Sequence, residues 1–218
     1  MSALTIPVLP AGRRERRKHA TRADLLAAGR KLFGAKGLYE SRIEDLSAGA
    51  GIAKGTIYGY FSGKDELVRA VVEAGYRELQ DELRAELCLV RGRQARIGRL
   101  VRVHARYFEQ RRDLLRVLHQ ARGMLKFDRA EWRPLRSSLD RHLEVLTELL
   151  ADGRAARLPR ALAREQASAL FGAMSGAMSV HVALSPRRAG PLLGPSVVGA
   201  LVALALSFER LPRPERPA

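Results

Sequence analysis

One short predicted helix carries side chains whose types and spacing suit contact with nucleic acid. A Gly-Ile-Ala turn precedes residues 54–60, and glycine tolerates the positive φ at which a helix ends. We expect a helix over 54–60 with Ile57 facing inward and Lys54, Thr56 and Tyr58 facing outward. An ammonium and two hydroxyl groups can bond phosphates and base edges. The pattern predicts a DNA-binding surface.

Capping signals place further helices on both sides of this segment. Ser41 and Glu44 have the S-x-x-E spacing of a capping box, so we expect a helix to begin near Arg42. Ser62 and Asp65 form a second such box and predict the start of the next helix. Two short helices joined by a glycine-containing turn are typical of the DNA-binding helix-turn-helix.

An earlier helix completes this unit. Residues 25, 28, 29, 32 and 33 repeat with the spacing of one apolar helix face, which predicts a three-helix head over residues 20–66. Residues 1–19 are predicted to be a disordered basic arm. Its basic residues are Arg13, Arg14, Arg16, Arg17 and Lys18. Two interpretations remain open for the arm, a solvated segment or a contact with phosphates or a minor groove.

Composition limits the class of protein and its partners. The chain has 218 residues, 46% of them hydrophobic, and a net charge of +16, which favours an anionic partner such as nucleic acid. The basic excess is spread along the chain, so charge alone does not locate the contact. The single cysteine, Cys88, excludes an internal disulfide, and its apolar neighbours predict a buried thiol. We expect no cofactor and no metal site.

The remaining chain reads as helical throughout, because no segment alternates with the two-residue period of a strand. The predicted fold class is all-α, with a C-terminal effector-binding and dimerisation domain over residues 67–212 and a disordered tail over 213–218. Apolar and aromatic residues with a few polar ones are candidates to line a pocket for a hydrophobic effector. The alternative for each of them is core packing. The candidates are His104, Tyr107, Phe108, His119, Met124, Phe127, Trp132, Phe171 and Met174.

The last two predicted helices suggest contact between two copies of the chain. Residues 161–184 carry a stripe of small side chains, and residues 196–210 are apolar on more than one face. Length and polarity argue against a membrane span in both, which predicts a cytoplasmic protein. We expect a four-helix bundle across a two-fold axis, with an ordinary intrachain core as the alternative. The candidate interface residues are Gly172, Gly176, Val180, Val198, Leu201, Val202 and Ala205.

The head resembles a known family. The runs Leu-Leu-Ala-Ala-Gly-Arg-Lys-Leu-Phe at 25–33, Gly-Leu-Tyr-Glu-Ser-Arg-Ile-Glu-Asp-Leu at 37–46, Ala-Gly-Ile-Ala-Lys-Gly-Thr-Ile-Tyr-Gly-Tyr-Phe at 50–61 and Lys-Asp-Glu-Leu at 64–67 are similar to TetR-family transcriptional regulators. The resemblance covers about residues 20–70. It implies a homodimer that binds operator DNA, usually as a repressor, and responds to a small molecule in the C-terminal domain.

The resemblance also implies which residues meet DNA. They are Ser41, Arg42, Lys54, Gly55, Thr56, Tyr58, Gly59, Tyr60 and Lys64. Lys54 and Thr56 match positions that touch bases or nearby phosphates, whereas Tyr58, Tyr60 and Lys64 match phosphate contacts. For Phe61 we expect core packing instead.

Two positions depart from the family pattern, and two other functions remain as alternatives. Arg42 stands where a small hydroxyl residue is common, and Gly59 removes a side chain that often reads a base. A basic protein that coats DNA without regard to sequence is one alternative. A small helical enzyme is the other, although no nucleophile elbow, phosphate-binding loop or HExxH motif is visible in the chain.

Overall fold

The structure, a computed structural model, describes residues 12–125, 130–151, 159–184 and 190–207. Within these residues all the regular secondary structure is helical, which confirms the predicted all-α class. The elements in chain order are α1 (Arg13–Lys36), α2 (Ile43–Ala50), α3 (Lys54–Tyr58), α4 (Lys64–Leu87), α5 (Arg93–Gln110), α6 (Arg112–Met124), the 3-10 turn η1 (Ala130–Trp132), α7 (Arg133–Ala151), α8 (Arg160–Leu184) and α9 (Pro195–Ser207).

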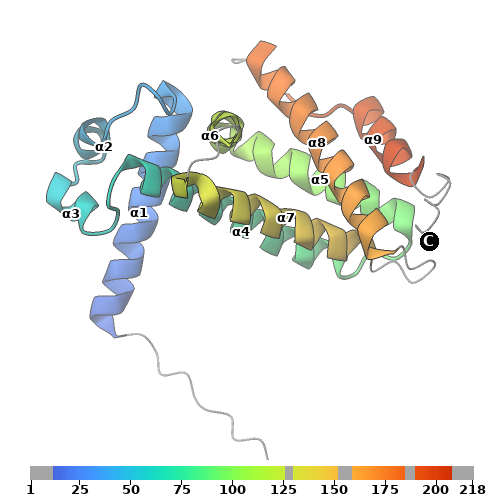
Figure 1. Cartoon of the computed structure of the whole chain (residues 1–218), viewed down its shortest axis with the longest axis horizontal. Helices are drawn as coiled ribbons and strands as arrows, with labels where there is room; N and C mark the ends of the chain where they lie inside the picture. The colour runs from blue at the N-terminus through green and yellow to red at the C-terminus, as the bar shows by residue number, and fades with distance from the viewer. Residues whose placement is uncertain (1–11, 126–129, 152–158, 185–189, 208–218) are drawn as a thin grey trace, which may run out of the picture.

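Helices α1, α2 and α3 form a small head at one end of the molecule (Figure 1). Its core is built from the apolar faces that the periodicity predicts. The fully or nearly fully buried side chains are Leu25, Phe33, Leu38, Ile43, Leu46, Ile57, Phe61 and Leu67. Leu67 belongs to α4, so the long helix that leaves the head also helps to close it.

Helix α1 begins earlier than the sequence analysis predicts. Gly12 precedes it, and the Arg16 amide donates to the Gly12 carbonyl at 3.0 Å. The predicted cap Thr21 instead lies inside the helix, where its hydroxyl donates to the Arg17 carbonyl at 3.0 Å. Arginine and lysine are good helix formers, so the helix extends through residues 13–19. The predicted disordered arm and the boundary at residue 20 are wrong for these residues, while residues 1–11 and the tail at 213–218 lie outside the described chain.

The two predicted capping boxes use different residues. The Ser41 hydroxyl donates to the Gly37 carbonyl at 2.5 Å, so it is not free to cap α2. The box moves one residue on, and the Arg42 amide donates to Oδ2 of Asp45 at 2.9 Å. At α4, the acceptor for the Ser62 amide is Glu66 at 2.6 Å instead of the predicted Asp65.

Helices α4 to α9 form the body, in which α7 packs between α4 and α8 and α9 packs on α5 and α8 (Figure 1). Helix α8 has 25 residues and is apolar enough to cross a membrane by length and composition alone, so the expectation that these properties exclude a span is corrected. It packs against α6, α7 and α9, and 39% of its most apolar stretch is buried. Cys88, predicted to be buried, is exposed just after α4.

Candidate nucleic-acid interface

The turn between α2 and α3 has the geometry of a helix-turn-helix. Helix α2 ends at Gly51, whose φ of 64° and ψ of 26° lie in the left-handed region that glycine favours. The Ile52 amide donates to the Ser47 carbonyl at 3.2 Å, and the Ser47 hydroxyl donates back to the Ile52 carbonyl at 2.8 Å. These two bonds fix the angle at which α3 follows α2.

Helix α3 ends at Tyr58, two residues earlier than predicted. It is held to the head by Ile57, which is fully buried. The predicted contact residues on the opposite face are exposed: Arg42, Lys54, Gly55, Thr56, Tyr58 and Gly59. Tyr60 is half-buried, and Phe61 is buried in the core as expected. One short helix therefore presents an ammonium, a hydroxyl and a phenol to solvent without any cost in buried polar groups.

Two of the predicted contact residues have structural partners instead. The Ser41 side chain is fully buried and bonded to Gly37, so the prediction that its hydroxyl reaches DNA is wrong. The Lys64 ammonium donates to the carbonyls of Leu38 at 3.0 Å and Ser41 at 3.2 Å. Two of its three N–H bonds are used to hold the α1–α2 connection against α4.

An acidic side chain lies beside the exposed face of α3. Nζ of Lys54 is 3.0 Å from Oε1 of Glu44 on α2, and both side chains are about half exposed at 53%. The hydrogen bond from Lys54 lowers the pKa of the Glu44 carboxyl. At neutral pH the pair is therefore charged, and Lys54 must leave Glu44 or share its protons to contact a phosphate.

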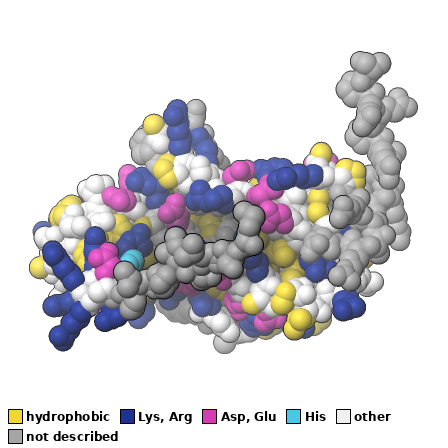
Figure 2. Space-filling view, turned by 90° about the horizontal axis from the view of Figure 1, so that it is seen from below, with side chains coloured by type: hydrophobic (Ala, Val, Ile, Leu, Met, Phe, Trp, Pro, Cys, Tyr) yellow, Lys and Arg dark blue, Asp and Glu magenta, His cyan; other side chains and the backbone are white. Residues whose placement is uncertain are grey.

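Basic side chains gather at the head end of the molecule. Figure 2 shows Lys and Arg side chains clustered at the left, the end at which α2 and α3 lie in Figure 1. The first turns of α1 project beyond the other helices (Figure 1), and residues 13–20 are all exposed. A basic helix end thus projects from the head in place of the predicted arm.

The comparison with known families fits this geometry. Residues 25–71, which span the second half of α1, all of α2 and α3 and the start of α4, match the sequence model of bacterial regulatory proteins of the tetR family. The head of the chain is therefore of the TetR type. Among curated proteins, no sequence matches the chain.

Solved structures share the fold of this chain over most of its length. The fatty acid degradation regulator FadR of Bacillus halodurans has a TM-score of 0.71 at 19% identity, covering 84% of this chain and 97% of its own. FadR of Bacillus subtilis in complex with stearoyl-CoA has a TM-score of 0.68 at 16% identity, covering 85% and 96%. A putative regulator of Saccharomonospora viridis in complex with choline has a TM-score of 0.64 at 19% identity, covering 88% and 96%. At these identities the likeness shows the fold.

Helix α6 connects the TetR-type head to the body. The Leu38 amide of the head donates to Oε1 of Gln120 on α6 at 2.7 Å. Nε of Arg30 on α1 lies 3.0 Å from Oδ2 of Asp113 at the start of α6. A Cβ built on Gly34 of α1 would lie 2.6 Å from Cβ of Asp113, so the two helices are in direct backbone contact there.

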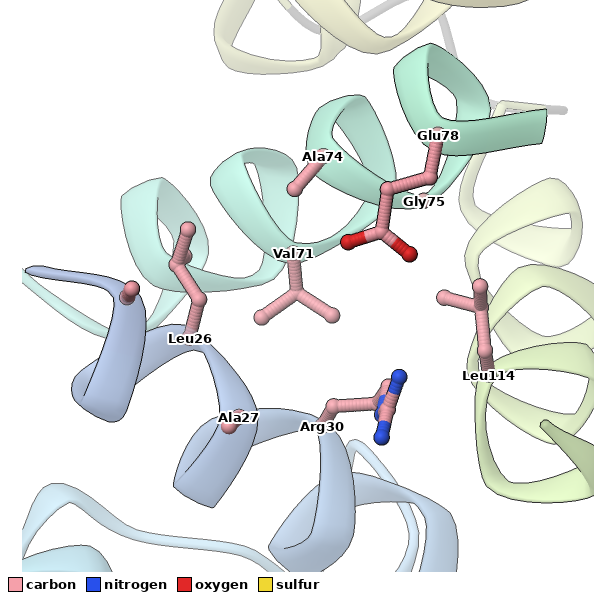
Figure 3. A pocket seen from close by; sticks show the side chains of 9 residues that line it. Leu26, Ala27, Arg30, Val71, Ala74, Gly75, Glu78 and Leu114 are labelled. Atoms are coloured by element: carbon pink, nitrogen blue, oxygen red, sulfur yellow. The ribbon is translucent and has the colours of Figure 1, made fainter. Parts of the chain in front are cut away.

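The same junction is open on its other side. A cavity of about 140 Å³ lies between α1, α4 and α6. In Figure 3 the Arg30 and Glu78 side chains extend into it from α1 and α4, with Leu114 of α6 across from them. Head and body therefore meet through one close contact and one incompletely filled space.

The predicted pocket residues lie in the body, most of them within its core. His119 lines a surface cavity of about 260 Å³ between α6 and α8. The Tyr107 hydroxyl donates to the Gly75 carbonyl at 2.9 Å, so it is used within the core. The others with described side chains are buried: His104, Phe108, Trp132, Phe171 and Met174. Phe127 and the Met124 side chain lie outside the described residues.

Three polar residues of the body were missed by sequence reasoning. His142 of α7 is fully buried against His104, with 3.3 Å between their Nε2 atoms. Tyr76 of α4 stacks on the His142 ring with centroids 4.7 Å apart. The guanidinium of Arg122 on α6 lies 4.7 Å from the centroid of the Phe171 ring. These residues are far apart in sequence, and no local pattern marks them.

The predicted dimer residues divide into two groups. Gly172, Gly176 and Val180 are exposed along one side of α8, while Val198 and Val202 of α9 are half-buried. Leu201 and Ala205 are buried within the chain itself. The prediction is wrong for these two, because α9 turns them toward α5 and α8.

Proposed function

We propose that this chain is a ligand-responsive, sequence-specific regulator whose homodimer represses transcription at a palindromic operator until a small molecule releases it. The observation that carries the proposal is the exposed Lys54, Thr56 and Tyr58 face of α3, held by the buried Ile57. A helix seated in this way can place a few side chains against base edges in the major groove. We place the protein in the cytoplasm, at the nucleoid when bound to DNA.

The proposed domains are a helix-turn-helix head, residues 20–66 extended back to Arg13, and an effector-binding and dimerisation body over residues 67–212. We propose that α6 transmits the effector signal, because Gln120, Asp113 and the close contact at Gly34 connect it directly to the head. An effector that shifts α6 would change the angle of both heads in a dimer and so their fit to the two half-sites.

Footprinting of the promoter regions beside the gene tests the proposal. A discrete protected site with two-fold symmetry supports a dimeric regulator. Uniform protection of every sequence would instead support the basic DNA-coating protein and overturn sequence-specific regulation. Adding the small-molecule effector should abolish the footprint. Stronger protection in its presence would contradict release of the protein from DNA.

Lys54→Ala is expected to weaken operator binding about tenfold or more, because it removes a contact with a base or phosphate. The logarithmic dependence of affinity on salt should also become shallower by about one. Fluorescence anisotropy at several salt concentrations measures both. Arg77→Ala is the matched control, since it removes one positive charge from an exposed position on α4 in the body. Equal effects of the two variants would place the DNA-binding surface elsewhere.

Glu44→Gln is expected to strengthen operator binding by only a few fold, because one exposed charge pair is weak. The amide removes a negative charge beside α3 and frees the Lys54 ammonium for phosphate. The same anisotropy titration at low salt measures the gain, which salt should reduce. Glu148→Gln, exposed on α7, is the control for net charge. If Glu44→Gln binds more weakly, the carboxylate positions Lys54 for DNA instead of competing with it.

A further inference from the structure

A polar cluster lies at the point where five helices of the body meet. It consists of His104 of α5, His142 of α7, Tyr76 of α4, Arg122 of α6 and Phe171 of α8. Ring centroids are 5.5 Å apart between the two histidines and 5.0 Å apart between His142 and Phe171. Both histidines are fully buried. Polar groups so deep in a core are normally fully hydrogen-bonded.

The hydrogen bonds of the histidine pair determine where its protons lie. Nδ1 of His104 is 2.9 Å from the Leu100 carbonyl, which can only accept, so Nδ1 carries the proton. In the neutral ring Nε2 of His104 is then an acceptor. It must receive the Nε2–H of His142 across 3.3 Å. His142 is therefore left with a bare Nδ1, a buried acceptor that no protein atom of the described chain satisfies.

Burial keeps both histidine rings neutral in the free protein. It lowers the pKa of His104 to about 4. Burial also lowers the pKa of His142 well below its ordinary value, and the positive charge of Arg122 acts in the same direction. The remaining group that faces His142 is the Tyr76 phenol of α4, whose pKa burial raises. The unsatisfied acceptor is therefore present at neutral pH.

Arg122 is the cation of this cluster. Its Nη2 donates to the Ser175 hydroxyl at 3.0 Å, and its guanidinium hydrogen-bonds Tyr76. Its Nε is shielded from solvent, and no atom of the described chain accepts a hydrogen bond from it. Among the described residues no carboxylate pairs with it; the Glu73 carboxylate of α4, for example, engages Ser138. A shielded cation is normally paired.

From these observations we infer that the cluster recognises the carboxyl group of a hydrophobic monocarboxylic acid. One carboxyl oxygen accepts from Arg122, and the other shares a proton with Nδ1 of His142. The Phe171 ring, which packs against both His142 and Arg122, would contact the apolar remainder. This inference deepens the proposed function by naming the chemical class of the effector, and it rests on that function for its regulatory meaning.

The proton balance distinguishes an acid from other ligands. At neutral pH the free ligand is a carboxylate and His142 is neutral, so two facing acceptors would repel each other. The complex therefore takes up one proton from solvent, whether the proton resides on the carboxyl oxygen or on Nδ1. An alcohol could donate to Nδ1 and accept from Arg122 without proton uptake. It would leave the Arg122 charge unpaired, which is why the acid is favoured.

Titration calorimetry with the full-length wild-type protein tests this directly. The probes are acetate, benzoate and octanoate, each paired with its alcohol: ethanol, benzyl alcohol and 1-octanol. We expect at least one acid to bind, with an affinity that falls about tenfold for each pH unit between pH 6 and 8. Its binding enthalpy should vary with the ionisation enthalpy of the buffer, as uptake of one proton requires. The alcohols should bind more weakly and without pH dependence.

Arg122→Gln should abolish acid binding, whereas Arg77→Gln, an exposed change of the same charge, should leave it intact. The inference is overturned if no acid binds, if binding takes up no proton, if each alcohol binds as tightly as its acid, or if Arg122→Gln binds acid normally. The proton measurement needs no variant, so it decides the question even if Arg122→Gln fails to fold. Operator binding by the ligand-free protein is measured separately, and its loss would refute the proposed function without affecting carboxylate recognition.

Discussion

Gly34→Ala is expected to lower the free energy of unfolding by about 1–3 kcal/mol, the range for overpacking a close contact. The added Cβ would lie 2.6 Å from Cβ and 2.7 Å from Cα of Asp113. Real Cβ atoms do not approach backbone so closely, so α1 and α6 must separate. Urea unfolding followed by circular dichroism measures the loss. Because the same contact connects head to body, the variant should also bind operator more weakly.

Two other glycines provide controls for Gly34→Ala. Gly49 on α2 has no atom within 4 Å of an added Cβ, so Gly49→Ala should stabilise the fold by up to about 1 kcal/mol through helix propensity. Gly75→Ala would meet the Leu114 side chain at 2.5 Å, which can rotate at smaller cost. The expected order of stability is Gly49→Ala, then Gly75→Ala, then Gly34→Ala. Equal stability of all three would show that the α1–α6 contact yields freely.

The head could be predicted from sequence because its signals are local. The apolar spacing that ends at Phe33, the glycine turn at Gly51 and the inward Ile57 each act within a few residues, and all three are confirmed. Errors arose where another group competed for the same donor. Ser41 has the right spacing for a cap, but the Gly37 carbonyl takes its hydroxyl. The phosphate contact of Lys64 stays a prediction, and its ammonium also donates to the carbonyls of Leu38 and Ser41.

The body was predicted less completely. His104 could be proposed as a pocket residue from its type, but its partner His142 is 38 positions away on another helix. Arg122 reads in sequence as one more surface arginine among many. Only tertiary packing shows that it is shielded beside Phe171. Likewise, the apolar pattern of α9 identifies a helix with several neighbours, yet it cannot say that Leu201 and Ala205 face their own chain.

Gly176→Glu is expected to convert a homodimer into monomers, and it isolates the interface more cleanly than a buried change would. Gly176 is exposed on α8, and no atom lies within 4 Å of an added Cβ. The single chain can therefore accept glutamate with helix content unchanged. In a dimer across α8 the carboxylates would be buried near their symmetry mates, and unpaired buried charge is strongly unfavourable.

Light scattering coupled to size exclusion measures the mass of Gly176→Glu, and circular dichroism checks that the helices persist. Ala85→Glu is the matched control, because it adds the same charge to an exposed helical position on α4. Monomeric Gly176→Glu with dimeric Ala85→Glu would place the two-fold axis along the Gly172 and Gly176 side of α8. Such monomers should also lose most operator affinity, since each head alone contacts a single half-site. A persisting dimer would move the interface away from α8, and the spacing of the two heads would have to be derived from another face of the body.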